Sequence, residues 1–339
     1  MSQGLPSGAG TPARARDPIH PLPPTPDEAP RRRAGNLALR LVTAALLIPP
    51  LIYVIFQGGL WVLATVVVLT LLGVNEFYHL IEAKGAEPLR GVGTLAAVSL
   101  PVVSYLGSDY AATVLLSFLL LGLMVAQLGK AQIGEALASI SGTFFGVFYI
   151  GWLLSFAVSL RGFYHVVQGR WGPDAVAGMH PDAGTFYLLF VISAVIAGDV
   201  GAYFVGRRYG KRKLAPRVSP GKTVEGAYGA IAGGLLVGLA CKALFDAFRP
   251  ELSSQLSWLA CAFLSVILAG VGIVGDLVES LLKRDAQVKD TGTLLPGTGG
   301  LLDRIDSNLL AIPVGYYLLL AHTFLFGRVP LAAVGEGPF

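Results

Sequence analysis

Long apolar runs alternate with short polar segments over most of this chain. From residue 37 onward we count nine runs, and each is close to the ~20 residues that a helix needs to cross the hydrocarbon core of a bilayer. The pattern predicts an all-α, polytopic integral membrane protein with about nine transmembrane helices. The expected spans are residues 37–57, 59–76, 91–107, 110–128, 134–159, 185–206, 226–247, 256–277 and 308–326.

The composition agrees with a membrane protein. Of the 339 residues, 54% are hydrophobic and only 14% are charged, whereas a soluble chain of this length carries about 25% charged residues. Cys241 and Cys261 lie in apolar runs without metal-ligand spacing, so we interpret both as small core residues.

Prolines and arginines dominate the first 35 residues, which contain few large aliphatic side chains. Such a segment cannot bury enough apolar surface to fold, and we expect residues 1–35 to be a disordered cytoplasmic tail. The remaining organisation is predicted as N-terminal transmembrane helices over 36–180, a C-terminal transmembrane catalytic region over 181–327, and a short tail over 328–339.

Positive charges are distributed unevenly between the loops. If the N-terminus is inside, 20 of the 25 lysines and arginines fall on the inner side of the nine spans. This asymmetry predicts a multi-pass protein of the cell (inner) membrane with its N-terminus in the cytoplasm and its C-terminus outside. It also places the two most polar loops, which follow the sixth and the eighth spans, on the cytoplasmic face.

The stretch from Asp276 to Asp306 concentrates acids, cations, hydroxyls and glycines. If the eighth span continues as a helix, Asp276, Ser280, Lys283 and Arg284 share one face. Pro296 and the glycines around it predict a turn with exposed backbone N–H groups. A second helix should open at Leu301, with Asp303 and Asp306 on one face. The alternative is a solvated loop between two helices. We prefer a magnesium–nucleotide site, because this loop joins two spanning helices and is unusually rich in charged residues. The candidate residues here are Asp276, Ser280, Lys283, Arg284, Asp303, Arg304, Asp306 and Ser307.

The loop from Asp199 to Gly226 carries the second group of candidates. Asp199 lies near the cytoplasmic end of the sixth span and should face the bundle interior, as a site residue or in a helix-packing hydrogen bond. The segment Ser219-Pro220-Gly221-Lys222-Thr223 resembles a phosphate-holding loop without P-loop spacing. For Glu225 we favour helix capping over metal binding. For Glu76, at the end of the second span, we favour an interfacial charge over membership of the site.

These residues together resemble the signature of the phosphatidate cytidylyltransferases, also called CDP-diacylglycerol synthases. The resemblance covers about residues 195 to 310, and the first half of the chain agrees only in being polytopic. The family usually has histidine where this chain has Thr298, which puts an imidazole function there in doubt. The matching positions are Asp199-x-Gly201-Ala202-Tyr203-x-x-Gly206-Arg207, Ser219-Pro220-x-Lys222-Thr223-x-Glu225-Gly226, Ser280-x-x-Lys283-Arg284, Lys289-Asp290 and Pro296-Gly297-x-Gly299-Gly300-x-x-Asp303-Arg304-x-Asp306.

The resemblance implies transfer of a cytidylyl group from CTP to phosphatidate, with magnesium (Mg2+) as cofactor and membrane lipids as surroundings. We expect Asp276, Asp303 and Asp306, together with Asp199, to bind the metal. Cations would hold the phosphates of CTP and of the lipid, hydroxyls would add hydrogen bonds, and glycines would let the backbone approach the nucleotide. The expected cations are Lys222, Lys283, Arg284, Lys289 and Arg304, the hydroxyls Ser219, Thr223 and Ser280, and the glycines Gly297, Gly299 and Gly300.

Two other functions compete with this one. A transporter for an anionic solute would suit many spans, but its site should lie near the bilayer midplane between repeated halves, and here the charges gather at one face. A CTP-dependent enzyme could also act on another lipid phosphate, since nothing in the apolar spans identifies acyl chains. We expect no nucleic-acid partner, and a homodimer is left open.

Overall fold

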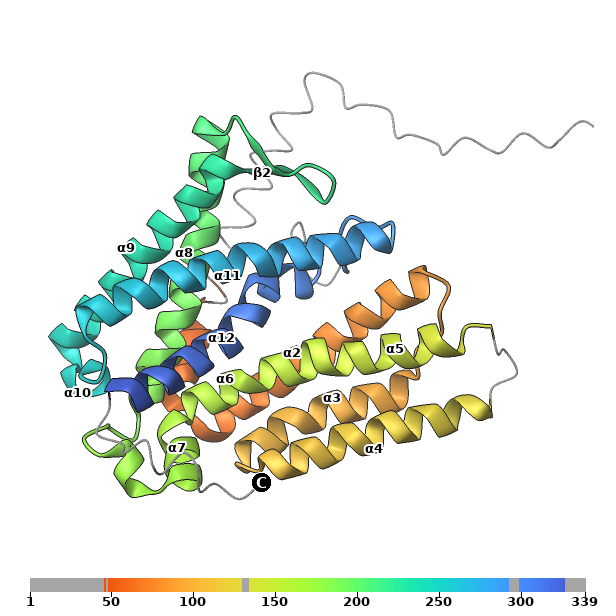
Figure 1. Cartoon of the computed structure of the whole chain (residues 1–339), viewed down its shortest axis with the longest axis horizontal. Helices are drawn as coiled ribbons and strands as arrows, with labels where there is room; N and C mark the ends of the chain where they lie inside the picture. Colours follow the sequence, from red (N-terminus) through yellow and green to blue (C-terminus); the bar gives the residue numbers. More distant parts are fainter. Residues whose placement is uncertain (1–45, 47, 130–133, 293–298, 327–339) are drawn as a thin grey trace, which may run out of the picture.

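The computed structural model describes residues 46, 48–129, 134–292 and 299–326, and these form a helical membrane bundle with one small hairpin (Figure 1). Seven helical segments in this part of the chain are long and apolar enough to cross a membrane. The helices are α2 (Gly59–Ala83), α3 (Arg90–Tyr105), α4 (Asp109–Leu128), α5 (Ala136–Gly146), η1 (Val147–Trp152), α6 (Leu153–Arg161), α7 (Phe163–Trp171), η2 (Pro173–Val176), α8 (Ala183–Tyr209), α9 (Val224–Phe248), α10 (Pro250–Ser253), α11 (Trp258–Asp285) and α12 (Leu302–Phe326).

The seven long segments coincide with seven of the nine expected spans, so the all-α membrane fold is confirmed. The expected span 91–107 is the 16-residue helix α3, which contains Pro101 and is shorter than a full crossing. The expected span 37–57 lies partly outside the described residues, which include an apolar helix only over Ile48–Gln57. The count of nine therefore stays a prediction. Both tails, 1–35 and 328–339, also lie outside the described residues.

Two expected helix extensions are confirmed. Helix α11 runs without a break to Asp285, so the polar segment from Asp276 onward continues the apolar span. Helix α12 begins at Leu302, one residue after the expected start, and continues through the last span to Phe326. Helix α2 is longer than expected because it continues to Ala83, and this places Glu76 inside a helix instead of at its end.

Small residues allow α8 and α9 to pack closely. A Cβ atom added at Gly233 of α9 would lie 2.6 Å from the carbonyl oxygen of Ala197 in α8, and one added at Gly229 would lie 2.6 Å from that of Gly201. Such close backbone approach is typical of helix pairs in membranes, where packing replaces the hydrophobic driving force. Asp199 lies in α8 between the two residues that make these contacts, Ala197 and Gly201.

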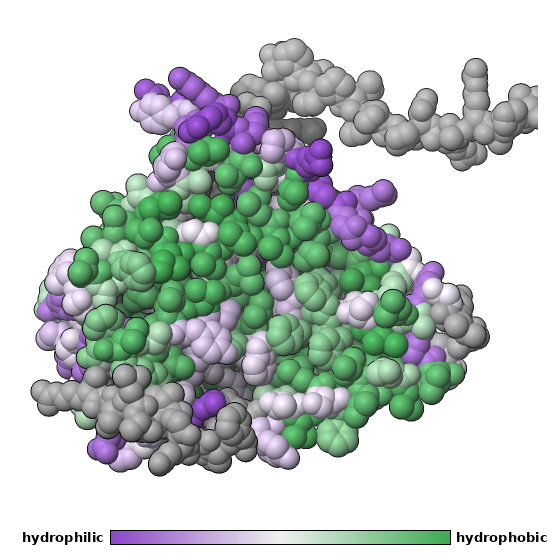
Figure 2. All heavy atoms as spheres, in the orientation of Figure 1, coloured by the Kyte–Doolittle hydropathy of each residue, from purple (hydrophilic) through white to green (hydrophobic). Residues whose placement is uncertain are grey.

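The connection between α8 and α9 contains a β-hairpin that the sequence analysis did not predict. Strand β1 (Lys213–Ala215) pairs antiparallel with β2 (Ser219–Thr223), with Lys213 opposite Thr223. The hairpin projects from one end of the bundle (Figure 1). Hydrophilic residues gather at this end in Figure 2, whereas apolar side chains cover the flanks of the bundle, as expected for surfaces that face lipid.

The N-terminal and C-terminal regions share one hydrophobic core. Phe156 of α6 packs against Tyr316 and Tyr317 of α12, with ring centroids 5.4 and 5.3 Å apart. At the hairpin end, Lys84 after α2 forms an ion pair of 2.6 Å with Asp285 at the end of α11. The end of α2 therefore lies beside the end of α11, the helix that carries several candidate residues.

We predict that Gly233→Leu destabilises the bundle, because the new side chain would collide with the backbone of Ala197. Overpacking of this kind costs about 1–3 kcal/mol. The matched control is Gly270→Leu in α11, where an added Cβ meets nothing within 4 Å. Thermal unfolding in detergent should show a lower midpoint for Gly233→Leu only. Equal midpoints for the two variants would contradict the close packing of α8 and α9.

Candidate active site

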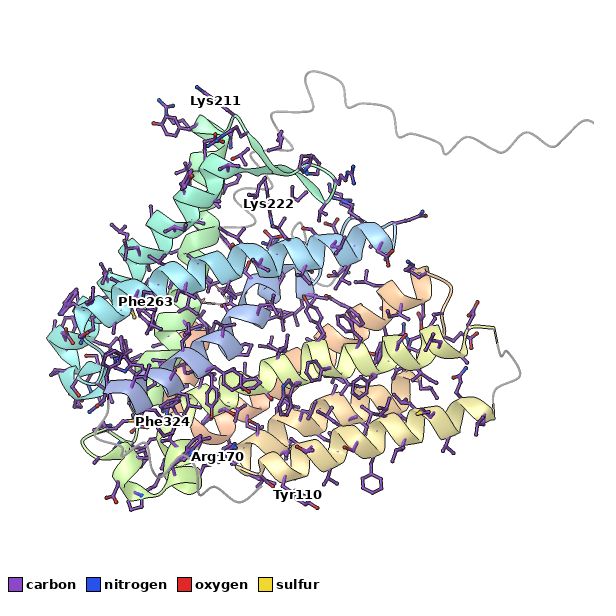
Figure 3. All side chains as sticks on the ribbon, viewed as in Figure 1. Tyr110, Arg170, Lys211, Lys222, Phe263 and Phe324 are labelled. Atoms are coloured by element: carbon purple, nitrogen blue, oxygen red, sulfur yellow. The ribbon has the colours of Figure 1, made fainter. Side chains whose placement is uncertain are left out.

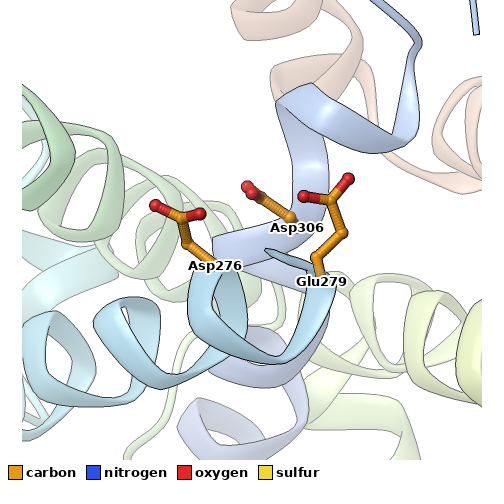
Figure 4. A group of neighbouring side chains, drawn as sticks. All are labelled: Asp276, Glu279 and Asp306. Atoms are coloured by element: carbon orange, nitrogen blue, oxygen red, sulfur yellow. The ribbon is translucent and has the colours of Figure 1, made fainter. Parts of the chain in front are cut away.

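Three carboxylates meet where the end of α11 crosses the start of α12. Asp276 and Glu279 come from α11 and Asp306 from α12, and one oxygen of each lies within 4.8 Å of the others (Figure 4). We call these three residues the acidic group. Glu279 is fully buried, and neither of its oxygens accepts a hydrogen bond apart from an ion pair with Lys283. Hard oxygen donors at this spacing, with unused acceptor capacity, suit a divalent cation such as Mg2+.

A glycine makes the acidic group possible. A Cβ atom added at Gly275 would lie 2.8 Å from the carbonyl oxygen of Asp306 and 3.1 Å from the Cα of Ser307. The backbones of α11 and α12 therefore approach closely beside Asp276. Asp199 of α8 is linked to the same place, because its Oδ1 accepts a hydrogen bond of 3.2 Å from the hydroxyl of Ser307. Asp199 is therefore linked to α12 beside Asp306 but is not one of the three carboxylates of the acidic group, and its expected role as a metal ligand stays a prediction.

A cavity of about 360 Å³ lies next to the acidic group, between α8, α9, α11 and the hairpin. Lys222 of β2 points toward α11 (Figure 3), and its Nζ lies 2.8 Å from Oδ2 of Asp276. Ser280 donates a hydrogen bond of 3.3 Å to the other oxygen of Asp276. The cavity is lined by Asp199, Ala202, Tyr203, Gly206, Arg207, Leu214, Gly221, Lys222, Thr223, Gly226, Ala227, Ile273 and Asp276.

Lys283 joins the acidic group to a second set of polar residues. Its Nζ lies 2.5 Å from Oε2 of Glu279 and 2.6 Å from Oδ1 of Asp303. The other oxygen of Asp303 accepts hydrogen bonds from the backbone N–H and the hydroxyl of Thr291 and from the N–H of Gly300. Asp303 is not one of the three carboxylates of the acidic group, so its expected role as a metal ligand stays a prediction. In this structure it binds Lys283, Thr291 and Gly300.

Glu76 corrects another expectation of the sequence analysis. We favoured an interfacial charge, yet its side chain is buried, with 7% of the residue exposed. Its carboxylate accepts hydrogen bonds of 2.8 Å from the backbone N–H groups of Leu301 and Leu302, and one of 3.1 Å from the hydroxyl of Thr291. The N-terminal half of the chain thus contributes directly to the surroundings of the site.

Several expected phosphate-binding groups have other or additional contacts. Thr223 caps α9, since its hydroxyl accepts a hydrogen bond from the N–H of Gly226, although it also lines the cavity. Glu225 accepts hydrogen bonds from the N–H groups of Lys211 and Arg212. It therefore ties the hairpin to α9, and Thr223 provides the helix cap that we expected from Glu225.

The remaining candidates are placed as follows. The guanidinium of Arg284 reaches the hairpin, 3.4 Å from the carbonyl oxygen of Val218. Lys289 and Arg304 are exposed, and Ser219 is half-buried in β2. Gly299 has φ of +90°, a conformation that favours glycine. Gly297 and Thr298 lie outside the described residues.

Glu279 and Thr291 are the residues that the sequence analysis missed. Glu279 follows Asp276 by three positions and precedes Lys283 by four, so helical spacing could have placed it on the same face. Thr291 carries no comparable signal. Its importance comes from two carboxylates, Glu76 and Asp303, that reach its hydroxyl from different helices.

Comparison with known proteins shows the family to which this chain is similar. Residues 38–322 match the model of the cytidylyltransferase family. A phosphatidate cytidylyltransferase of Synechocystis sp. is 31% identical over 298 residues, which cover 83% of this chain and 96% of the relative. A chloroplastic phosphatidate cytidylyltransferase of Arabidopsis thaliana is 30% identical over 331 residues, which cover 92% of this chain and 80% of the relative.

A phosphatidate cytidylyltransferase of Pseudomonas aeruginosa is 50% identical over a shorter stretch of 134 residues, or 40% of this chain and 47% of the relative. The match to the family model extends from before α2 into α12, so it includes the hairpin, the acidic group and Glu76. On the breadth of that match, this chain belongs to the cytidylyltransferase family.

Proposed function

We propose that this protein transfers a cytidylyl group from CTP to phosphatidate and so produces CDP-diacylglycerol and pyrophosphate. The observation that carries the proposal is the ion pair between Lys222 and Asp276 on the wall of a cavity. It brings a phosphate-binding cation next to a group of carboxylates that suits a metal ion. The family match and the names of the similar proteins support the reaction and its two substrates.

The chemistry requires positioning more than it requires an activated side chain. An oxygen of the lipid phosphate attacks the α-phosphorus of CTP, and the bond from that phosphorus to the oxygen bridging to the β-phosphate breaks. The electron pair of the broken bond leaves with pyrophosphate. Because the attacking phosphate is already an anion, no serine or cysteine nucleophile is needed. The main difficulty is to bring two polyanions together.

Lys222 is suited to bind a phosphate at the cavity, where its present partner is Asp276. Arg207 also lines this cavity and adds a second positive charge. Lys283 is held between Glu279 and Asp303, so its ammonium group is fixed near the acidic group without further ordering. Fixed charges of this kind stabilise a developing anion without the cost of reorganising them during the reaction.

Magnesium is the cofactor that we propose, and Asp276, Glu279 and Asp306 would hold it, with Asp199 close by. The donor set fits, because Mg2+ prefers carboxylate oxygens and commonly binds through one or two of them beside substrate phosphates. When bound, the ion would neutralise charge on the triphosphate and on the departing pyrophosphate.

We further propose that the site faces the cytoplasm at the inner face of the cell membrane. The distribution of lysine and arginine between the loops supports this orientation. The reactants are also consistent with it, since CTP is soluble whereas phosphatidate stays in the bilayer. A homodimer stays a prediction.

The purified full-length protein should release pyrophosphate from CTP only when phosphatidate and Mg2+ are both present. Each substrate and the metal can be omitted in turn in a detergent assay that also detects CDP-diacylglycerol. Pyrophosphate release without phosphatidate would indicate simple hydrolysis. If a sample that binds CTP releases no pyrophosphate with phosphatidate, the substrate would have to be another lipid phosphate.

Asp276→Asn should reduce kcat by about 100-fold or more, because it removes one charged oxygen from the metal-binding set. Asp285→Asn on the same helix is the matched control, since Asp285 is exposed and pairs with Lys84. Both variants should elute from a sizing column like the parent protein. Equal kcat values for the two variants would refute the assignment of Asp276.

Lys222→Ala should raise the KM for CTP by roughly 10- to 100-fold, because a hydrogen bond to a charged group contributes about 1.5–3 kcal/mol. Lys213→Ala in the opposite strand of the hairpin is the control, since Lys213 is exposed and lies outside the cavity lining. Initial rates over a range of CTP concentrations separate KM from kcat. An equal effect of both substitutions would mean that Lys222 contributes only general positive charge.

A further inference from the structure

Glu76 occupies an unusual position for a carboxylate in a transmembrane helix. It is buried in α2, more than 200 residues away in sequence from every partner of its side chain. Burial of a carboxylate is costly unless hydrogen bonds replace its hydration. The N–H groups of Leu301 and Leu302 provide that replacement, together with the hydroxyl of Thr291, whose single proton is shared between Glu76 and Asp303.

The partners of Glu76 lie on both sides of residues 293–298. Thr291 and Gly292 precede this segment, and Gly300, Leu301 and Leu302 follow it. A Cβ atom added at Gly292 would lie 2.7 Å from Oε1 of Glu76, and one added at Gly300 would collide with Oε2 of Glu76 and Oγ1 of Thr291. One carboxylate therefore packs against both ends of the segment, and the two glycines leave room for it.

The same carboxylate lies at the start of α12. The first N–H groups of a helix have no partner within the helix, and a negative charge at this end is favourable. Glu76 accepts two of these N–H groups at 2.8 Å each. Asp306 of the acidic group lies about one turn further along α12. A shift in the start of α12 would therefore move this carboxylate.

A second connection runs through side chains. The hydroxyl of Thr291 lies 3.1 Å from Oε2 of Glu76 and 3.1 Å from Oδ2 of Asp303. Asp303 in turn holds Lys283, and Lys283 holds Glu279 of the acidic group. Glu76 is thus linked to the acidic group both through the backbone of α12 and through a series of polar contacts.

We propose that Glu76 is a positioning residue for cytidylyl transfer: it sets the start of α12 and thereby the placement of Asp306 and Lys283 at the reaction centre. This inference rests on the proposed function of the site. Glu76 acts through Thr291 and the first turn of α12, and it does not line the cavity that we assign to the nucleotide. Its loss should therefore affect turnover much more than the binding of CTP.

The first test compares Glu76→Gln with Glu82→Gln, a control on the same helix whose exposed carboxylate pairs with Arg90. Glutamine keeps the size of the side chain but removes its negative charge. It also replaces one carboxylate oxygen by an NH2 group, which cannot accept a hydrogen bond from Leu301 or Leu302. We expect Glu76→Gln to lower kcat by about 10- to 100-fold, the cost typical of a small misplacement at a reaction centre. The KM for CTP should stay near that of the control.

Thr291 provides a second variant that changes fewer contacts. Thr291→Val keeps the shape but removes the hydroxyl that joins Glu76 to Asp303, whereas Thr291→Ser keeps this hydroxyl. The valine variant should lose turnover and the serine variant should recover most of it. In a Glu76→Gln and Thr291→Val double variant, the two losses should not add, because both residues belong to one network.

Hydrogen exchange gives a readout that does not depend on activity. The amides of Leu301 and Leu302 should exchange at least about tenfold faster in Glu76→Gln than in Glu82→Gln, because they lose a buried acceptor. If the parent protein forms no CDP-diacylglycerol, the proposed function fails, and unchanged exchange in Glu76→Gln would separately overturn the positioning role. With an active parent protein, a normal kcat in both Glu76→Gln and Thr291→Val would overturn it. A rise in the KM for CTP at unchanged kcat would do the same.

Discussion

Three carboxylates crowded together at one end of an apolar bundle are the constraint on which the rest of this structure depends. Like charges at short range repel strongly, and the removal of water increases this cost. Two lysines and several hydrogen-bond donors offset it: Lys222 reaches Asp276, and Lys283 reaches Glu279. Because ionisable groups within a membrane protein are costly and commonly functional, we propose that this arrangement is a site instead of a packing contact.

The bundle satisfies this constraint by close approach of backbones. Gly275 lets α12 lie against α11, and glycines in α9 let α8 lie against α9. The helices that carry Asp199, Asp276 and Asp306 therefore converge. Apolar side chains cover the flanks of the bundle, and hydrophilic residues gather at the end where the hairpin projects (Figure 2). A soluble nucleotide and a lipid phosphate can meet at such a boundary, because one substrate comes from water and the other from the bilayer.

The N-terminal half is more than an apolar support. Its helix α2 supplies Glu76, and Lys84 after α2 pairs with the end of α11. The sequence signature of the family covers only the second half, so sequence reasoning assigned no function to the first. The family match extends over both halves, and in the structure a residue of α2 binds the start of α12.

The sequence by itself determined the membrane class, seven of the spans, the helical continuation of α11 through Arg284 and the start of α12 to within one residue. It could do so because hydrophobic length and helical spacing are local properties. From residue type and spacing it also proposed Asp276, Asp306, Lys222 and Lys283 as site residues, and the structure places them near one another. Only the tertiary structure decided which carboxylate meets which partner. Glu279 joined the acidic group, Asp303 was directed to Lys283 and Thr291, and Glu76 was buried against Leu301 and Leu302. These pairings depend on how helices far apart in the sequence cross, and helix crossing is set by side-chain packing that no local pattern records.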